Sequence, residues 1–236
     1  MPIPCYLALT AAEFPNATHL PDKIAWMACH FSCYGTGLSN LPEGLPEGSM
    51  VILNDRMPPD SHDPKRIVAQ LLELTADAKP DALLLDFQRS GIALNRQLAQ
   101  ELAEALPCPV GVTAEYAKDS GCAVFLEPPP LHISLADHIA PWGAQEVWLE
   151  IAPQTFTYTV DQDGCTIAEQ ENAPLPEPVF LDENLSIRYH TELLDNAAVF
   201  TLQRTKDDLI QLLKGACRIT RAVGLYQQLE CMQFSQ

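Results

Sequence analysis

The chain alternates short apolar runs with segments of helical periodicity. Eight runs rich in Val, Ile, Leu and Ala end at polar or turn residues. Most of them lack polar alternation, which is typical of strands buried on both faces. We expect the strands at Ile3–Leu9, Ile24–Phe31, Met50–Asn54, Ala82–Phe87, Val110–Thr113, Ala123–Leu126, Glu146–Ala152 and Ala197–Leu202.

Helical spacing is clearest between the third and fourth strands, where apolar residues recur every three or four positions. Asp63 followed by Pro64 predicts the start of this helix, because aspartate is a good N-cap and proline suits the first turn. Further helices are expected at Asn95–Leu106, Asp207–Cys217 and Ala222–Met232.

The order strand, helix, strand predicts parallel pairing through right-handed crossovers. Eight strands in 236 residues favour an α/β fold of the (β/α)8 TIM-barrel type, trimmed because some connections are too short for full helices. An open doubly wound sheet is the alternative. No linker divides the chain, so we expect one barrel domain over residues 1–236, and the apolar amino terminus is interpreted as its first strand.

A second pattern follows the seventh strand. Residues alternate between apolar and polar on both sides of Asp163-Gly164, which predicts a β-hairpin over Phe156–Glu169. A proline-rich connection comes after it. The hairpin is therefore expected as an insertion in the barrel.

The charge balance restricts the partners. Fourteen basic residues face 31 acidic ones, giving a net charge of −17. Nucleic acid and anionic membrane surfaces are therefore unfavourable partners. No apolar run approaches the ~18–20 residues of a membrane span. The eight cysteines lie mostly in apolar runs, which favours reduced thiols and a cytoplasmic protein, the alternative being one expressed without its export signal. The oligomeric state is left open.

Polar side chains gather after the apolar runs, where the active site of a barrel lies. The alternative is that every strand must end in something polar. Trp142 and Trp148, at the seventh strand, add rings that can stack on a sugar, although buried packing is the commoner use of tryptophan. The candidate ligand-binding residues are Asn54, Asp55, Arg56, Gln88, Arg89, Glu115, Tyr116, Glu127, Trp148 and Arg204.

The fourth strand ends unusually for so apolar a run. Strand alternation places Asp86 and Gln88 on the face of Leu84, which in a barrel is the interior. A carboxylate there is costly unless it is paired, and Arg56 or Arg89 is within reach along the sequence. A structural ion pair at the barrel mouth is the alternative to a ligand site.

Other chemistry has little support in the sequence. Cys29, His30 and Cys33 lack the second ligand pair of a zinc site, so no metal is predicted. Neither a nucleophile elbow nor a phosphate-binding glycine loop is present, and we expect no cofactor.

The stretch from Asp81 to Gln88 resembles the D-x-x-D-x-D-x-E motif of glycoside hydrolase family 18, the chitinase type. Asp81 and Asp86 match its first and third aspartates, whereas Leu84 replaces the second and Gln88 replaces the glutamate. The second strand, KIAWMACHFS, also looks like its counterpart in the family. The Met-x-Tyr-Asp of the sixth strand and the tryptophan of the eighth are missing.

The resemblance implies a TIM barrel that binds a small carbohydrate-like ligand at its carboxyl-terminal face. In the family the final glutamate is the general acid and the aspartate before it orients the substrate. Gln88 cannot deliver a proton, so we expect a pseudoenzyme that binds without hydrolysis. One alternative is an active hydrolase using Asp86 and Glu150 as catalytic residues. Another is a scaffold with a vestigial pocket, which binds a protein through the hairpin.

Overall fold

The computed structural model describes residues 4–9, 23–33, 37–57, 62–127, 135–150, 155–160, 166–171, 179–180, 188–194, 197–203 and 218–225. Everything below concerns these residues.

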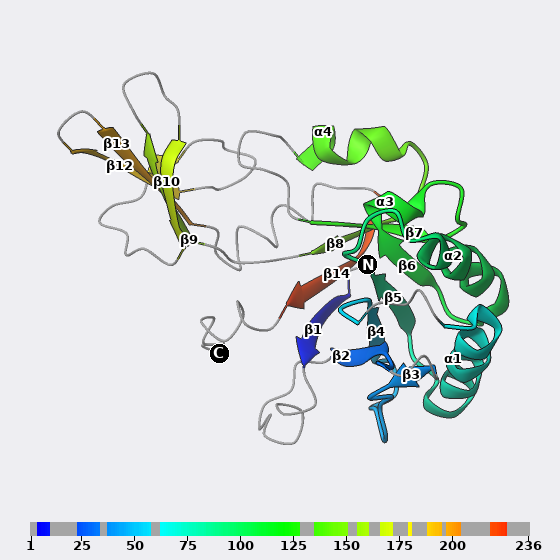
Figure 1. Ribbon diagram of the computed structural model, residues 1–236. Coiled ribbons are helices and arrows are strands. Elements are labelled where there is room, and N and C mark those ends of the chain that lie inside the picture. Colours follow the sequence, from blue (N-terminus) through cyan, green and yellow to red (C-terminus); the bar gives the residue numbers. More distant parts are fainter. Residues whose placement is uncertain are drawn as a thin grey trace.

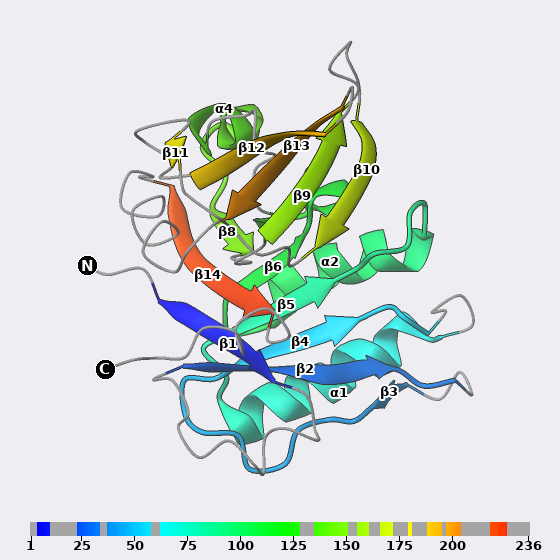
Figure 2. The same ribbon diagram turned by 90° about the vertical axis from the view of Figure 1, so that its left-hand side faces the viewer.

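Within them, eight strands pair in parallel in one sheet (Figures 1 and 2). In order around the sheet they are β1 (Cys5–Leu9), β2 (Ile24–Phe31), β4 (Met50–Asn54), β5 (Ala82–Asp86), β6 (Val110–Thr113), β7 (Ala123–Leu126), β8 (Val147–Glu150) and β14 (Ile219–Leu225). The strand β1 pairs in parallel with β2 on one side and with β14 on the other. The short β3 (Leu38–Ser39) pairs antiparallel with the end of β2. This is an α/β fold of the TIM-barrel type.

A five-stranded antiparallel sheet comes between β8 and β14 in the chain. It contains β9 (Thr155–Val160), β10 (Thr166–Glu171), β11 (Val179–Phe180), β12 (Arg188–Leu194) and β13 (Ala197–Gln203), in the order β10-β9-β13-β12-β11. The two strands expected around Asp163-Gly164 pair antiparallel as β9 and β10. Asp163-Gly164 itself lies outside the described residues.

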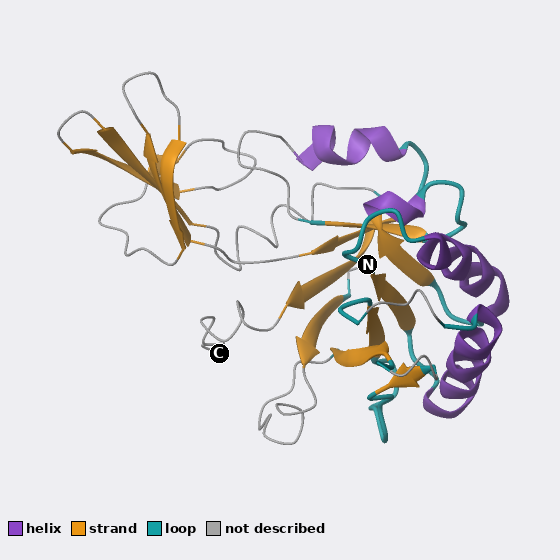
Figure 3. Ribbon diagram, in the orientation of Figure 1, coloured by secondary structure: helices purple, strands orange, loops and turns teal. Residues whose placement is uncertain are grey.

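The helices α1 (Pro64–Ala78) and α2 (Ala93–Ala105) lie along the outside of β4, β5 and β6 (Figures 1 and 3). Asp63 caps α1 as predicted, because its carboxylate accepts the Lys65 amide at 3.0 Å. The connections on either side of β7 are shorter: α3 (Ala114–Ala117), then α4 (Leu135–Ile139) with a 3-10 turn at Ala140–Trp142. The expected trimming of the barrel helices is visible in these segments.

Strand alternation separates two apolar cores. Leu83 and Leu85 of β5 pack outward with the helices, whereas Leu84 packs inward. The inward set also contains Trp148, which is fully buried. A Cβ at Gly111 would come within 2.3 Å of the Trp148 ring, so only glycine leaves room for it. The inward face of the parallel sheet is thus covered by packed side chains beneath the strand ends.

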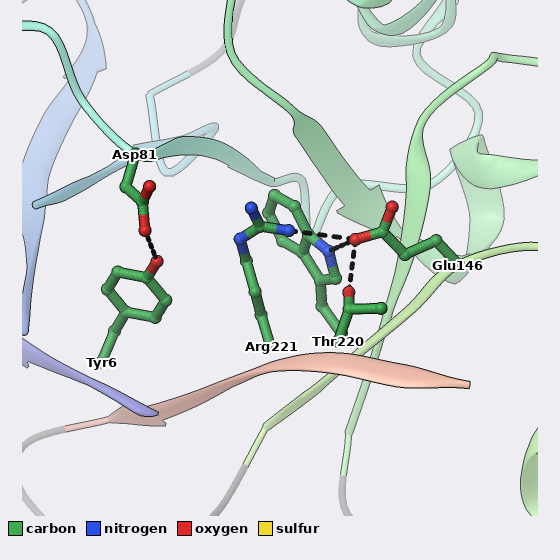
Figure 4. A network of polar contacts seen from close by, with 6 residues as sticks. Tyr6, Asp81, Glu146, Thr220 and Arg221 are labelled. Carbon is green, nitrogen blue, oxygen red and sulfur yellow. Dashed lines mark hydrogen bonds and ion pairs between the residues drawn. The ribbon is translucent and has the colours of Figure 1, made fainter. Parts of the chain in front are cut away.

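A polar network lies at the amino ends of the barrel strands (Figure 4). Glu146, just before β8, accepts hydrogen bonds from Arg221 at 3.0 Å, from the Trp148 indole at 2.9 Å and from Thr220. Beside it, the Tyr6 hydroxyl donates to Asp81. In barrels the amino-terminal end serves stability, and this network ties β1, β5, β8 and β14 together there.

The carboxyl-terminal third corrects two expectations. Ala197–Leu202, expected as the eighth barrel strand, belongs to β13 of the second sheet, and Ile219–Leu225 takes its place beside β1 and β8. Residues 222–225 are therefore strand rather than the start of a helix over Ala222–Met232. Ala197–Leu202 is an apolar run of strand length, whereas Ile219–Leu225 contains Thr220 and Arg221, and length and polarity do not specify a pairing partner. The expected helix Asp207–Cys217 lies outside the described residues.

Candidate functional site

Asp86 is the last residue of β5 and lies opposite Asn54 of β4 in the register. It is two positions beyond Leu84 of the inward core, so its side chain continues the inward face at the carboxyl end of the strand. The carboxylate is half-buried. Within the described residues it forms no ion pair with Arg56 or Arg89. The sequence alternative of a structural ion pair at Asp86 is therefore wrong for these residues.

Gln88 reaches back to Asp86. Its side-chain amide Nε2 donates to Asp86 Oδ1 at 2.5 Å, and the Gln88 side chain is otherwise exposed. Burial raises the pKa of Asp86, and the charges of Asp55 and Glu127 add to the rise. The amide of Gln88 and the charge of Arg56 oppose it without cancelling it. The pair presents a carboxylate and an amide at the end of one strand.

Glu127 and Glu150 add two carboxylates at the ends of β7 and β8. Glu150 ends β8, and Glu127 follows β7, each two positions beyond the paired residues Phe125 and Trp148. Burial raises the pKa of Glu150 to about 7, and the negative charges of Glu127 and Asp86 contribute. Glu150 is half-buried, whereas Glu127 is exposed. A carboxyl group of this pKa can hold a proton near neutral pH.

Asp55 is buried at 1% exposure, directly after β4. Its Oδ1 accepts the backbone amide of Gln88 at 2.8 Å. Its Oδ2 accepts the backbone amide of Arg89 at 3.0 Å and the side-chain amide of Asn95 at 2.8 Å. Asp55 was expected to contact a ligand. Its buried carboxylate instead accepts hydrogen bonds from the protein itself and holds the loop after β5 in place.

Other residues expected to bind a ligand hold the same loop. Arg89 donates its guanidinium to the backbone oxygens of Asp55 and Arg56, both at 2.9 Å. The hydroxyl of Tyr116, itself 1% exposed, donates to the Arg89 carbonyl and accepts the Ile92 amide. Arg89 and Tyr116 therefore hold residues 89–92 in place. Tyr116 is buried, whereas Arg89 is exposed, and its contact with a ligand stays a prediction.

Glu115 fixes the loop from the β6 side. Its Oε1 accepts the Gly91 amide at 2.6 Å, and this bond is the main cause of the lowered pKa of Glu115. The Glu115 side chain remains exposed to solvent while it makes this hydrogen bond. The charges of Asp86, Glu127 and Glu150 act on one another, so these three side chains form one acidic group. Glu115 instead holds the loop after β5.

Asn54 has a structural task as well. It is 6% exposed, and its amide donates to the Cys29 carbonyl at 2.9 Å and to the Met27 carbonyl at 3.4 Å. These carbonyls flank a register shift between Trp26 and Cys29 in β2. Asn54 thus ties the end of β4 to the irregular part of the β2 ladder.

Trp148 does not present its ring to a ligand, because none of its surface is exposed. The Arg221 guanidinium lies 4.9 Å from its ring centroid on the amino-terminal side of the barrel. Trp142, the other candidate for sugar stacking, packs partly buried against the outer core. Arg204 lies outside the described residues.

Sequence reasoning missed two contributors. Asn95 is fully buried and bonds to Asp55, and Thr113 donates its hydroxyl to the Phe87 carbonyl at 2.8 Å. Asn95 shares helical spacing with Leu98 and Leu102 of the buried face of α2. A polar residue on an apolar helix face was the available signal, because a buried amide needs partners.

A hollow of about 700 Å³ lies elsewhere, between residues 41–47 and the outer side of α1. No candidate site residue lines it. Among the described residues, no group of three or more His, Cys, Asp or Glu side chains is placed to hold a metal ion. No helix in this part of the chain is long and apolar enough to cross a membrane.

Comparison with known proteins adds to this picture. No family model matches the chain, and no curated protein matches its sequence. Solved structures do match its fold. A GH18 chitinase from Cycas revoluta in complex with (GlcNAc)3 superposes with a TM-score of 0.60 at 11% identity, over 95% of each chain. A mutant of that chitinase in complex with (GlcNAc)4 gives 0.60 at 12% identity over the same shares.

A candidate sporulation-specific glycosylase, YdhD of Bacillus subtilis, superposes with a TM-score of 0.50 at 9% identity. The match covers 85% of this chain and 90% of the other. At these identities the likeness is one of fold. The chain is an α/β protein of the TIM-barrel type. More narrowly, its fold is like that of the GH18 chitinases.

Proposed function

We propose that this chain is a closed (β/α)8 barrel of the glycoside hydrolase type, with the five-stranded sheet inserted between its seventh and eighth strands. It binds a carbohydrate at the carboxyl ends of the barrel strands and does not hydrolyse it. The observation that carries the proposal is the hydrogen-bonded pair of Asp86 and Gln88 at the end of β5. Localisation in the cytoplasm is part of the same proposal.

The pair suits a sugar because it offers both kinds of hydrogen-bonding group. Asp86 accepts hydrogen bonds from hydroxyl or amide groups, and the Gln88 amide can donate one and accept another. Both groups lie above an interior filled by Leu84 and Trp148, so a ligand would sit at the mouth rather than inside the barrel. The structural neighbours with (GlcNAc)3 and (GlcNAc)4 support an oligosaccharide of this kind as the first ligand to test.

Hydrolysis by this pair is disfavoured by the chemistry of the amide. Cleaving a glycosidic bond requires an acid that protonates the leaving oxygen, and a primary amide supplies no proton near neutral pH. Losing such a group typically lowers the rate by ~10²–10⁴-fold. An amide at this position can still hydrogen-bond to the glycosidic oxygen. Binding without turnover is the expected result.

Titration calorimetry with (GlcNAc)3 and (GlcNAc)4 tests the binding. Gln88→Ala removes an exposed side chain, so we expect the fold to persist and the affinity to fall by about 2- to 10-fold, as for one neutral hydrogen bond. Asp86→Ala removes a charged acceptor and should weaken binding by about tenfold or more. Lys65→Ala, an exposed change at the start of α1, is the control. A natural protein that binds neither oligosaccharide contradicts the proposed ligand class.

A second candidate function is an active hydrolase that uses Asp86 and Glu150. The raised pKa of Glu150 favours it, because an acid with a pKa of about 7 is suited to general acid catalysis at neutral pH. Release of aryl groups from aryl chito-oligosaccharides and other aryl glycosides distinguishes the two candidates. Turnover that survives Gln88→Ala but not Glu150→Ala would establish the second candidate and reject the first.

A further inference from the structure

The loop after β5 is held by a carboxylate that has no cationic side chain as its partner. Asp55 takes part in no ion pair within the described residues, and the Arg89 guanidinium donates to its backbone oxygen instead. Both carboxylate oxygens are used by N–H donors, two of which are the consecutive backbone amides of Gln88 and Arg89. Such a bidentate contact fixes both the position and the direction of a peptide segment.

We propose that Asp55 is a positioning residue, which aims the side chain of Gln88 at Asp86 and thereby shapes the ligand-binding pair. The proposal rests on the proposed function for its consequence in binding, but the contact itself can be tested without a ligand. Asp55 is 1% exposed, so it does not itself reach a ligand. Its charge adds to the raised pKa of Asp86, whereas its hydrogen bonds act on Gln88 through the loop.

The other contacts of the loop lie on either side of Gln88. Thr113 holds the Phe87 carbonyl, Tyr116 holds the Arg89 carbonyl, and Glu115 holds the Gly91 amide. Of these loop contacts, the one made by Asp55 is to the backbone nitrogen of Gln88. Without the Asp55 contact, the loop is still held at Phe87 and at Arg89 by Thr113 and Tyr116. The backbone of Gln88 between them is then free to rotate. Loss of Asp55 should thus affect Gln88 more than the rest of the loop.

Asp55→Asn is the informative substitution, because it keeps the shape of the side chain and changes one oxygen into an amide group. Asn95 and the two backbone groups all donate to this side chain. An asparagine has one acceptor oxygen, so at least one of the buried donors loses its partner and faces another donor. The expected result is a displaced loop in a folded protein.

Hydrogen exchange measured by nuclear magnetic resonance reads the contact directly. In the natural protein we expect the Gln88 and Arg89 backbone amides to be protected although both side chains are exposed. In Asp55→Asn their exchange should be about tenfold faster or more, as for the loss of a hydrogen bond to a charged group. The Gln88 side-chain amide should also exchange faster as it leaves Asp86. Equal exchange in both proteins overturns the proposal, whether or not any sugar binds.

The binding consequence is read by a double-mutant cycle with (GlcNAc)4. If Asp55 acts through Gln88, then Asp55→Asn combined with Gln88→Ala weakens binding no more than the worse single change. Additive losses mean that Asp55 acts through general stability or through its charge near Asp86, and they overturn the positioning role. Leu71→Ala and the milder Ile67→Val, both in the outer core, should lower thermal stability and leave the affinity unchanged.

Asn95→Ala provides a second perturbation if Asp55→Asn does not fold. It removes one donor from Oδ2 and leaves both backbone contacts of Asp55 in place. We expect it to speed exchange at Arg89, which shares that oxygen, by less than about tenfold, because the backbone contact itself remains. Faster exchange of the backbone amides of residues 88 and 89, with an unchanged exchange rate of the Gln88 side-chain amide, would overturn the proposal. It would show that the loop does not determine the direction of the Gln88 side chain. Failure to bind (GlcNAc)4 in the natural protein rejects only the ligand class, because the exchange measurements still decide the positioning role.

Discussion

Replacing Glu150 by glutamine should stabilise the protein at alkaline pH and make little difference in acid. Glu150 is half-buried at the end of β8, where burial is the main cause of its high pKa. The charges of Glu127 and Asp86 act in the same direction. A neutral amide of the same length removes the cost of ionising a carboxyl group there.

The magnitude follows from the pKa. In the unfolded chain Glu150 has its ordinary value of 4.5, and in the folded protein it is about 7. The difference of about 2.5 pH units corresponds to about 3 kcal/mol, at about 1.36 kcal/mol per unit. Because the folded pKa is the higher one, the folded state binds more protons between these values. The stability that Glu150 contributes is therefore fully present below pH 4.5 and is lost as the pH rises towards 7.

Urea unfolding at pH 4 and pH 8 measures the effect. We expect the difference in unfolding free energy between Glu150→Gln and the natural protein to grow by about 3 kcal/mol in favour of the variant over this interval. Glu115→Gln is the matched control with the opposite sign, because the Gly91 amide lowers the pKa of Glu115. That variant should be the less stable one at pH 8, and the gap should close in acid. A pH-independent difference at Glu150 would refute the reasoning.

Two further changes test the packing and the capping of the fold. Gly111→Ala places a methyl group 2.3 Å from the Trp148 ring and should cost about 1–3 kcal/mol or more in thermal unfolding. Gly111→Ala combined with Trp148→Leu should recover part of that overpacking loss, and a purely additive result would contradict the contact. Asp63→Ala removes the N-cap of α1 and should lower the free energy of unfolding in urea by about 1 kcal/mol. Asp63→Ser keeps a capping oxygen and should lose much less stability. Equal losses for the alanine and serine variants would mean that the cap contributes nothing.

Local pattern was sufficient wherever a segment is decided by its own residues. The runs of β2, β4, β6 and β7 have the predicted boundaries, since each is mostly apolar and ends at or next to a polar residue. Asp63 and Pro64 started α1 where expected. The alternation that places Leu84 inward and Leu85 outward is a property of any strand, so the inward direction of Asp86 followed from it.

The local sequence pattern did not predict which strands pair with each other. The run of β13 is the more apolar, since β14 contains Thr220 and Arg221, yet β14 is the strand that lies between β8 and β1. Strand pairing depends on contacts between residues far apart in the chain, and periodicity carries no information on them.

The roles of the polar residues were likewise decided in three dimensions. The sequence alone determined that Asp86 and Gln88 share a strand end, that the interior beneath them is apolar, and that position 88 lacks an acid. Only the tertiary structure separated Asp86 and Gln88 from Asp55, Arg89 and Tyr116, which turn towards the loop. The reason is that a polar side chain takes its role from the donors and acceptors around it. Those partners come from β4, β5, α2 and α3, which only folding brings together.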